Sequence, residues 1–356
     1  MKKYILLITS IILLTFCTPS RKQNQEQNNH IVHDTTMLYI NKGNEKLDNE
    51  DLRGAYDLFI KAVELSPNSD TAHNCLGIVK SKLSDDQGAV INYTEAIRIN
   101  PLYMLAYYNR GLSKSKLGDN QGAIKDYTKA IEISPQDSKT YYNRGLIKAK
   151  LGDNQGAITD YSKAIQINPQ YIKAYFNRGN CKSRLGDNKG AINDYNKAIK
   201  LNPQDAEVYV NRGNSKSKLG DKKAAINDYN KAIELSPQNI NAYINLGVEK
   251  YDLGDYEGEI ATYYTALKNC IPEADLYNNL GRALYDLKRF KEATEAYSEG
   301  IKAFPSDGKL YYGRGLARNQ SGDKVGACED WHKSSELGCF QANALLPLCE
   351  ENNKSK

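Results

Sequence analysis

The sequence is poor in the residue types that usually mark a catalytic or metal-binding protein. Its 356 residues include only four histidines, and its seven cysteines form no Cys-x-x-Cys pair. A zinc site or other metal site is not expected, because a structural zinc needs closely spaced Cys and His ligands. No Ser/His/Asp set, phosphate-binding loop or convergent carboxylate pair stands out either. We therefore expect no enzymatic activity and no cofactor.

The sequence also has only a small excess of positive over negative charge. The formal net charge is +5, and 26% of the residues are charged. This imbalance is too small to predict a nucleic-acid partner. Phe and Trp are rare, with six and one copies, whereas Tyr occurs 26 times. The tyrosines come from repetition along the chain.

Long apolar runs are missing except at the N-terminus. Residues 4–16 form an apolar run after two lysines, too short to cross a bilayer but typical of a signal peptide. Leu14-Thr15-Phe16-Cys17 resembles a bacterial lipoprotein box. The resemblance implies that residues 1–17 direct export and that lipid on Cys17 anchors the chain to a membrane of the bacterial cell envelope. An uncleaved anchor or ordinary export is the alternative, because Phe16 stands where that box has a small residue.

Residues 18–35 are polar and rich in Gln and Asn. They have too few apolar side chains to bury a core of their own. We therefore predict a flexible polar tether over residues 18–35.

One stretch is repeated along the rest of the chain at a fixed period of 34 residues. Gly111 marks it and recurs at the same place in later copies, as Gly145, Gly179, Gly213, Gly247, Gly281 and Gly315. A fixed period of this length predicts a stacked array, in which each copy buries its apolar face against its neighbours. Nine repeats fit within residues 36–341: 36–69, 70–103, 104–137, 138–171, 172–205, 206–239, 240–273, 274–307 and 308–341.

Each repeat has the pattern of two helices joined by a short turn. In the third repeat Gly118 suits the end of the first helix, Asp119 can cap the second, and Pro135 stops it. The residues that recur resemble a tetratricopeptide repeat: Tyr107, Arg110, Gly111, Lys114, Ala123, Tyr127, Ala130 and Pro135. The resemblance implies an all-α, right-handed α-solenoid of stacked antiparallel helix pairs. Residues 340–349 read as one more amphipathic helix, so we expect residues 342–356 to supply a capping helix and a polar tail.

An arginine series and an aspartate series vary together among the repeats. Repeats with Arg110 or its equivalent have Asp sixteen residues later, and repeats with Leu there lack that Asp. We predict a structural ion pair inside each such repeat: Arg110 with Asp126, Arg144 with Asp160, Arg178 with Asp194, Arg212 with Asp228 and Arg314 with Asp330. A lysine series that includes Lys114 is expected to lay its stems over apolar surface, with the amines in water.

An asparagine series lies on another face of the first helices. In the resembling family this face lines a concave groove, so the amides, with aromatic and basic neighbours, suit an extended peptide that carries acidic groups. Amides that bond to solvent or to a neighbouring repeat are the alternative explanation. The candidate groove residues are Tyr108, Asn109, Lys116, Tyr142, Asn143, Lys150, Phe176, Asn177, Asn180, Arg184, Asn211, Asn214, Lys218 and Asn245.

Two cysteines near the C-terminus are placed to meet. Cys328 and Cys349 lie about ten residues on either side of a turn at Gly338-Cys339, and antiparallel helices would bring them level. A disulfide between them is one interpretation for an exported protein; unpaired thiols are the other.

The sequence therefore predicts a non-enzymatic protein–protein interaction scaffold, exported and lipid-anchored, that binds a peptide or protein in its groove. A structural or self-assembling envelope component, using the array ends or the convex face, is the alternative.

Overall fold

The computed structural model describes residues 21–349, and for residues 21–29 only the backbone. All regular elements in this range are helical, with eighteen α-helices and one 3₁₀ helix. The predicted all-α class, built of paired helices, is confirmed. The predicted signal peptide with Cys17, the first residues of the tether, and the tail from residue 350 lie outside the described residues.

The chain divides into two compact units. The N-terminal unit comprises residues 1–147 and the C-terminal unit residues 148–356, so the boundary falls within one helix, α7. Each unit contains several repeats.

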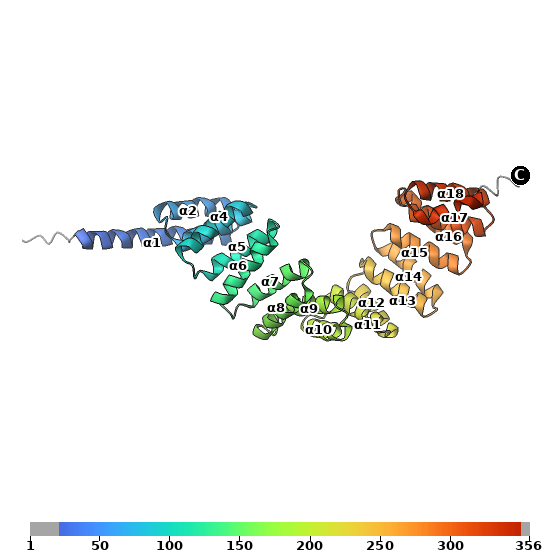
Figure 1. Cartoon of the computed structure of the whole chain (residues 1–356), viewed down its shortest axis with the longest axis horizontal. Helices are drawn as coiled ribbons and strands as arrows, with labels where there is room; N and C mark the ends of the chain where they lie inside the picture. The colour runs from blue at the N-terminus through green and yellow to red at the C-terminus, as the bar shows by residue number, and fades with distance from the viewer. Residues whose placement is uncertain (1–20, 350–356) are drawn as a thin grey trace, which may run out of the picture. The chain divides into compact units, whose positions relative to one another are not determined.

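Consecutive helices of the N-terminal unit pack side by side in antiparallel pairs, α1 with α2, α3 with α4, and α5 with α6 (Figure 1). Neighbouring pairs also contact each other, α2 with α3 and α4 with α5. The helices of this unit are α1 (Arg21–Asp48), α2 (Leu52–Leu65), α3 (Asp70–Lys82), α4 (Asp86–Ile99), α5 (Met104–Lys116), α6 (Asn120–Ile133) and most of α7 (Ser138–Lys150).

The C-terminal unit continues the pattern, because every helix from α8 to α18 contacts the helix before or after it. Its elements are α8 (Asn154–Ile167), α9 (Ile172–Arg184), α10 (Asn188–Leu201), α11 (Ala206–Lys218), α12 (Lys222–Leu235), α13 (Ile240–Asp252), α14 (Tyr256–Asn269), α15 (Ala274–Asp286), α16 (Phe290–Ala303), α17 (Gly308–Gln320), α18 (Lys324–Glu336) and the 3₁₀ helix η1 (Phe340–Ala344).

In six of the repeats the turn inside the helix pair follows from two residues, a glycine and an aspartate. Gly118 has φ +85°, a left-handed conformation that costs glycine little. The next residue, Asp119, accepts a hydrogen bond from the backbone N–H of Gly122 at 2.8 Å and so caps α6. In the eighth repeat Lys288 adopts φ 61° without a glycine, and Arg289 gives α16 no side-chain cap. α15 and α16 still pack against each other.

The recurring glycine allows the two helices of a repeat to cross closely. A Cβ atom on Gly111 would lie 2.8 Å from Cε1 of Tyr127, whose ring is almost fully buried. No real Cβ contact is that short, so a larger residue would push the ring out of the core. Gly43 meets Phe59 and Gly315 meets Trp331 in the same way.

The predicted flexible tether is largely helical in the structure. α1 begins at Arg21 and continues to Asp48, so residues 21–35 extend the first helix of the array. No Gly or Pro interrupts residues 21–42, and Lys, Gln and Glu favour helices. The packed part of α1, around Thr36 and Ile40, supplies a helix that can extend without a new nucleus.

The predicted capping helix also differs from the structure. Residues 340–344 form η1 rather than an α-helix, and a helical turn follows at residues 346–349. Pro347 explains the break, because a proline inside an α-helix lacks an N–H donor and clashes with the carbonyl four residues earlier. η1 packs against α18, where it buries Ala342.

Candidate functional site

The arginine and aspartate series form ion pairs within repeats. Arg110 donates to both carboxylate oxygens of Asp126, at 2.9 Å from Nε and 2.7 Å from Nη2. Its third group, Nη1, donates to Thr94 of the preceding repeat at 3.0 Å. Three further pairs have the same bidentate geometry: Arg178 with Asp194, Arg212 with Asp228 and Arg314 with Asp330. These guanidinium groups are occupied within the fold.

The fifth predicted pair, Arg144 with Asp160, has one member in each unit. In the N-terminal unit, Arg144 donates to Thr128 at 2.9 Å. In the C-terminal unit, Asp160 accepts from the Lys148 ammonium at 2.8 Å.

The lysine series does not reach water as expected. The Lys114 ammonium lies 2.9 Å from Asp126, although that carboxylate already binds Arg110. Lys148, Lys182 and Lys216 bind the buried aspartates of their own repeats in the same way. The aspartates hold these amines because a buried carboxylate needs charged hydrogen-bond donors on its remaining lone pairs.

Most amides of the asparagine series make contacts inside the array. In the N-terminal unit Asn109 donates to Asn74 at 3.1 Å, and Asn143 donates to Tyr108 at 2.9 Å. Each of these bonds joins one repeat to the preceding one. The inter-repeat explanation of Asn109 and Asn143 therefore has direct contacts, and the amides keep only part of their hydrogen-bonding capacity for a ligand.

The C-terminal unit has a similar set. Asn245 donates to Asn214 of the preceding repeat at 2.9 Å. Asn180 accepts from the Tyr195 hydroxyl at 2.7 Å. Asn177 and Asn211 are half-buried on the same series of helices.

The aromatic candidates are partly embedded. Tyr108 packs its ring 6.0 Å from that of Tyr127, and Phe176 lies 6.2 Å from Tyr195. Tyr142 is half-buried.

The basic candidates divide into two groups. Lys116 lies 3.3 Å from Asp86 and 2.9 Å from Ser81, so its charge is engaged within the N-terminal unit. In the C-terminal unit Lys150, Arg184 and Lys218 are exposed. None of these three makes an ion pair with any residue from 30 to 349.

Two helices of the C-terminal unit align these features. On α9, Phe176, Asn180 and Arg184 are spaced four residues apart and share one face. On α11, Asn214 and Lys218 follow the same spacing. α9 and α11 contact each other. The structure thus brings part of the predicted groove together as an aromatic, amide and basic strip on neighbouring helices.

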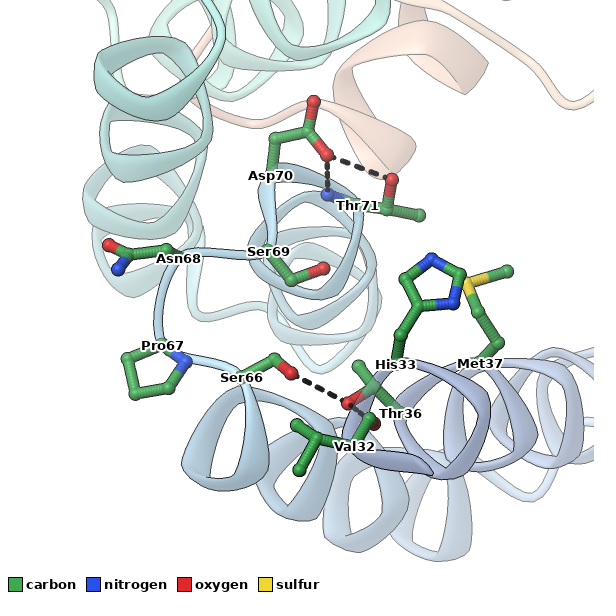
Figure 2. Close-up of a pocket in the computed structure, with 10 residues that line it drawn as sticks. All are labelled: Val32, His33, Thr36, Met37, Ser66, Pro67, Asn68, Ser69, Asp70 and Thr71. Atoms are coloured by element: carbon green, nitrogen blue, oxygen red, sulfur yellow. Dashed lines mark hydrogen bonds between the residues drawn. The ribbon is translucent and has the colours of Figure 1, made fainter. Parts of the chain in front are cut away.

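A cavity of about 500 Å³ lies in the N-terminal unit, between α1 and the start of α3 (Figure 2). Figure 2 shows His33 and Met37 projecting from α1 on the side of Thr71, with Thr36 Oγ1 hydrogen-bonded to Ser66 at 2.7 Å. Sequence reasoning missed this cavity because its α1 wall includes part of the predicted tether.

A second cavity, of about 350 Å³, lies in the C-terminal unit between α15, α17 and η1. Its tyrosine wall is formed by Tyr285, Tyr297 and Tyr312. The signal that could have found it is a departure from the asparagine series, since Gly313 stands at the position of Asn245.

Cys328 and Cys349 are joined by a disulfide with a Cα–Cα distance of 5.6 Å, an ordinary separation for such a bond. The bond fastens the segment after η1 to α18. Cys339 in the turn is a free thiol and half-buried. Three further free thiols are buried: Cys75, Cys181 and Cys270.

No group of three or more His, Cys, Asp or Glu side chains among residues 21–349 could hold a metal ion. No helix there combines the length and apolar character that spanning a membrane requires.

Models of the tetratricopeptide repeat match residues 105–137, 126–159, 206–239 and 274–307. A further TPR-repeat model matches residues 147–186 and 183–220. No curated protein matches the chain.

Several solved structures have the same fold. The C-terminal part of a TPR repeat-containing protein from Cytophaga hutchinsonii has a TM-score of 0.60 at 18% identity, covering 68% of this chain and 99% of that one. PilF of Pseudomonas aeruginosa has a TM-score of 0.53 at 17% identity, covering 59% and 96%. A tetratricopeptide repeat protein of Parabacteroides merdae has a TM-score of 0.50 at 21% identity, covering 70% and 99%.

These structural similarities concern the fold alone. The repeat matches agree with the helix pairs, with the close contact between Gly111 and Tyr127, and with the turns at Gly118 and its equivalents. The architecture is one that serves protein–protein interaction. The chain is a tetratricopeptide repeat protein.

Proposed function

We propose that the chain is a non-enzymatic scaffold that binds an extended, acidic segment of a partner protein along α9 and α11. The observation that carries this proposal is the set of uncommitted cations on the first helices of the C-terminal unit. Arg184 and Lys218 are exposed and lack ion-pair partners among the described residues, whereas the half-buried Arg178 and Arg212 on the same helices bind aspartates of their own repeats.

The neighbouring groups suit the same ligand. Phe176 offers an apolar surface about two turns before Arg184 on the same face of α9, and the half-buried Asn211 can both donate to and accept from a peptide backbone. An acidic side chain would bind Arg184 in a bidentate manner, which adds geometric specificity. The strip lies on α9 and α11, the first helices of neighbouring repeats, which contact each other.

The test is a double charge reversal, Arg184→Glu with Lys218→Glu, in the full-length protein. Partner proteins are captured from intact membranes after cross-linking and compared with those captured by the unchanged chain. The expected result is loss of the partner with unchanged helical content, because both side chains are exposed and surface changes cost little stability.

A matched control reverses two lysines on second helices, the half-buried Lys231 and the exposed Lys333, each to Glu; among the described residues each forms an ion pair only with a glutamate three residues away. The control should keep the partner. Equal capture by the groove variant and the unchanged chain would refute the proposal.

We place the scaffold at the bacterial cell envelope, exported and held by lipid on Cys17. The support is the basic start, the short apolar run and the cysteine that follows it.

A self-assembling envelope component is the second candidate. Its support is the first helix of the array, where Ile31 and Leu38 are 57% and 50% exposed. The two candidates separate in the charge-reversal test, because self-association through an array end does not depend on Arg184 and Lys218.

A further inference from the structure

At the interface between the sixth and seventh repeats, the side-chain amides of Asn214 and Asn245 are hydrogen-bonded to each other. The hydroxyl of Tyr229 donates to Oδ1 of Asn214 at 2.8 Å. The amide of Asn245, on the next repeat, donates to the same oxygen at 2.9 Å. A carbonyl oxygen at this place therefore accepts from a buried phenol and from an amide N–H.

Two repeats further on, the phenol is kept but both amides are lost. Tyr297 stands at the position of Tyr229, Arg282 at that of Asn214, and Gly313 at that of Asn245. Arg282 does not replace the amide, because its guanidinium lies 3.5 Å from Glu259 and 5.1 Å from the centre of the Tyr251 ring. The joint between the eighth and ninth repeats thus lacks the carbonyl acceptor.

The Tyr297 hydroxyl is left beside the space that the amides would fill. The side chain is 4% exposed and lines the cavity between α15 and α17. A Cβ atom on Gly313 would lie 2.6 Å from the hydroxyl oxygen. No residue from 30 to 349 accepts a hydrogen bond from it. Burial raises the pKa of Tyr297, so the group remains a neutral donor at physiological pH.

The cavity extends along the two helices and carries opposite charges at its ends. Lys309 lies in the first turn of α17, with its ammonium 4.0 Å from the exposed Asp275 of α15, and Asp286 is the last residue of α15. α15 and α17 are equivalent helices of consecutive repeats, so these charges are separated along the axis by about 16 Å. Tyr285, Tyr312 and Leu316 provide the apolar walls between them.

We propose that this cavity binds an extended peptide segment whose Asn or Gln side chain takes the place of the missing amides. The side-chain carbonyl accepts the hydrogen bond of Tyr297 above Gly313. An acidic residue on one side lies near Lys309 and a basic residue on the other near Asp286, a separation that five extended residues span, at about 13 Å plus the side chains. The proposal rests on the scaffold function but assigns a different binding place and a different ligand chemistry.

The experiment titrates the full-length protein with the peptide acetyl-Glu-Ala-Asn-Ala-Lys-amide by calorimetry. Its comparison peptide has Leu in place of Asn, with the same length and charges. We expect saturable one-to-one binding of the Asn peptide and at least about five-fold weaker binding of the Leu peptide. That ratio is typical of one uncharged hydrogen bond.

Two matched variants locate the site. Tyr297→Phe removes only a hydroxyl that has no hydrogen-bond acceptor among residues 30–349, so the variant should fold normally and bind the Asn peptide about five-fold more weakly. Tyr229→Phe removes the equivalent hydroxyl at the interface between the sixth and seventh repeats and should leave peptide affinity unchanged. Absence of saturable binding, equal binding of both peptides, or unchanged affinity in Tyr297→Phe would overturn the proposal.

Failure here is distinguishable from failure of the scaffold function. If partner capture from membranes depends on Arg184 and Lys218 while the Asn peptide does not bind, only the assignment of this cavity is wrong. If capture does not depend on them and the peptide still binds through Tyr297, the assignment of the strip on α9 and α11 as a binding site is wrong, and the assignment of this cavity is supported.

Discussion

Asp126 is the shared carboxylate of the ion-pair cluster in its repeat. Its carboxylate is 4% exposed and binds both Arg110 and Lys114. Such a cluster need not add much net stability, because desolvation offsets the attraction between the charges. Removing one member has a larger effect, since the remaining charges stay buried without a partner.

Replacing Asp126 with Ala should therefore lower the free energy of unfolding by about 3–5 kcal/mol. The eighth repeat supplies the control, because it has Leu280, Leu284 and Ala296 at the three equivalent positions. The triple variant with Arg110→Leu, Lys114→Leu and Asp126→Ala should recover most of the loss. Urea denaturation of the three proteins checks this, and a triple variant as unstable as the single one would contradict it.

The contact between α14 and α15 is built differently from the other joints. The seventh and eighth repeats lack the Arg–Asp pair, and Glu259 stands where other repeats have alanine. This carboxylate is fully buried, and its nearest cation is Arg282 on α15, at 3.5 Å. Oε2 of Glu259 has no hydrogen-bond partner among the described residues. Burial raises the pKa of Glu259 from 4.5 to about 7, although Arg282 and Tyr263 oppose the rise.

This pKa predicts a stability that falls as the pH rises. Between pH 4.5 and 7 the unfolded chain ionises Glu259 while the folded chain keeps it protonated, so folding is opposed. Since one pKa unit corresponds to about 1.4 kcal/mol, the loss across this window is about 3 kcal/mol. Glu259→Gln should remove this loss, whereas Glu295→Gln, at an exposed position of α16, should keep it. Urea denaturation at pH 5 and pH 7.5 measures the difference, and an identical pH dependence in Glu259→Gln and the unchanged chain would refute the assignment.

At the scale of the whole molecule, the array presents side chains on the faces of stacked helices. A scaffold can bind only partners in its own compartment, so the location of the protein limits which partners it meets. The first residues of the chain, with Lys2, Lys3, the apolar run and Cys17, are the part of the sequence that bears on location. A single acyl chain binds membranes only weakly, so stable anchoring needs more than one.

Changing Cys17 to Ser should release the protein from membranes and leave an unprocessed precursor. Membrane fractionation and the mass of the N-terminal peptide measure the two effects. The control is Cys339→Ser, which removes a free thiol far along the chain and should leave fractionation unchanged. Membrane association of the Cys17→Ser variant equal to that of the unchanged chain would show that lipid on Cys17 is not the anchor.

The sequence by itself determined the repeated helix pair. The period of Gly111 and its equivalents, the Gly-Asp turn and the prolines that stop the second helices are local signals, and the helices begin and end where these residues require. The covariation of Arg110 with Asp126 predicted a contact because the same positions are repeated several times in one chain. The tether was predicted wrongly, because low hydrophobicity was weighed without the helix propensity of residues 21–35 and the packed helix that they extend.

Only the tertiary structure decided what each polar side chain contacts. Lys114 binds Asp126 rather than water, and Asn109 binds Asn74 of the preceding repeat, because stacking sets distances between side chains that sequence spacing leaves open. The cavity at Tyr297 likewise depends on consecutive repeats, since Arg282, Tyr285 and Tyr297 of the eighth line it and Gly313 of the ninth adds no side chain. Periodicity fixes which residues occupy equivalent positions, but packing between neighbours fixes which of them remain free to bind a partner.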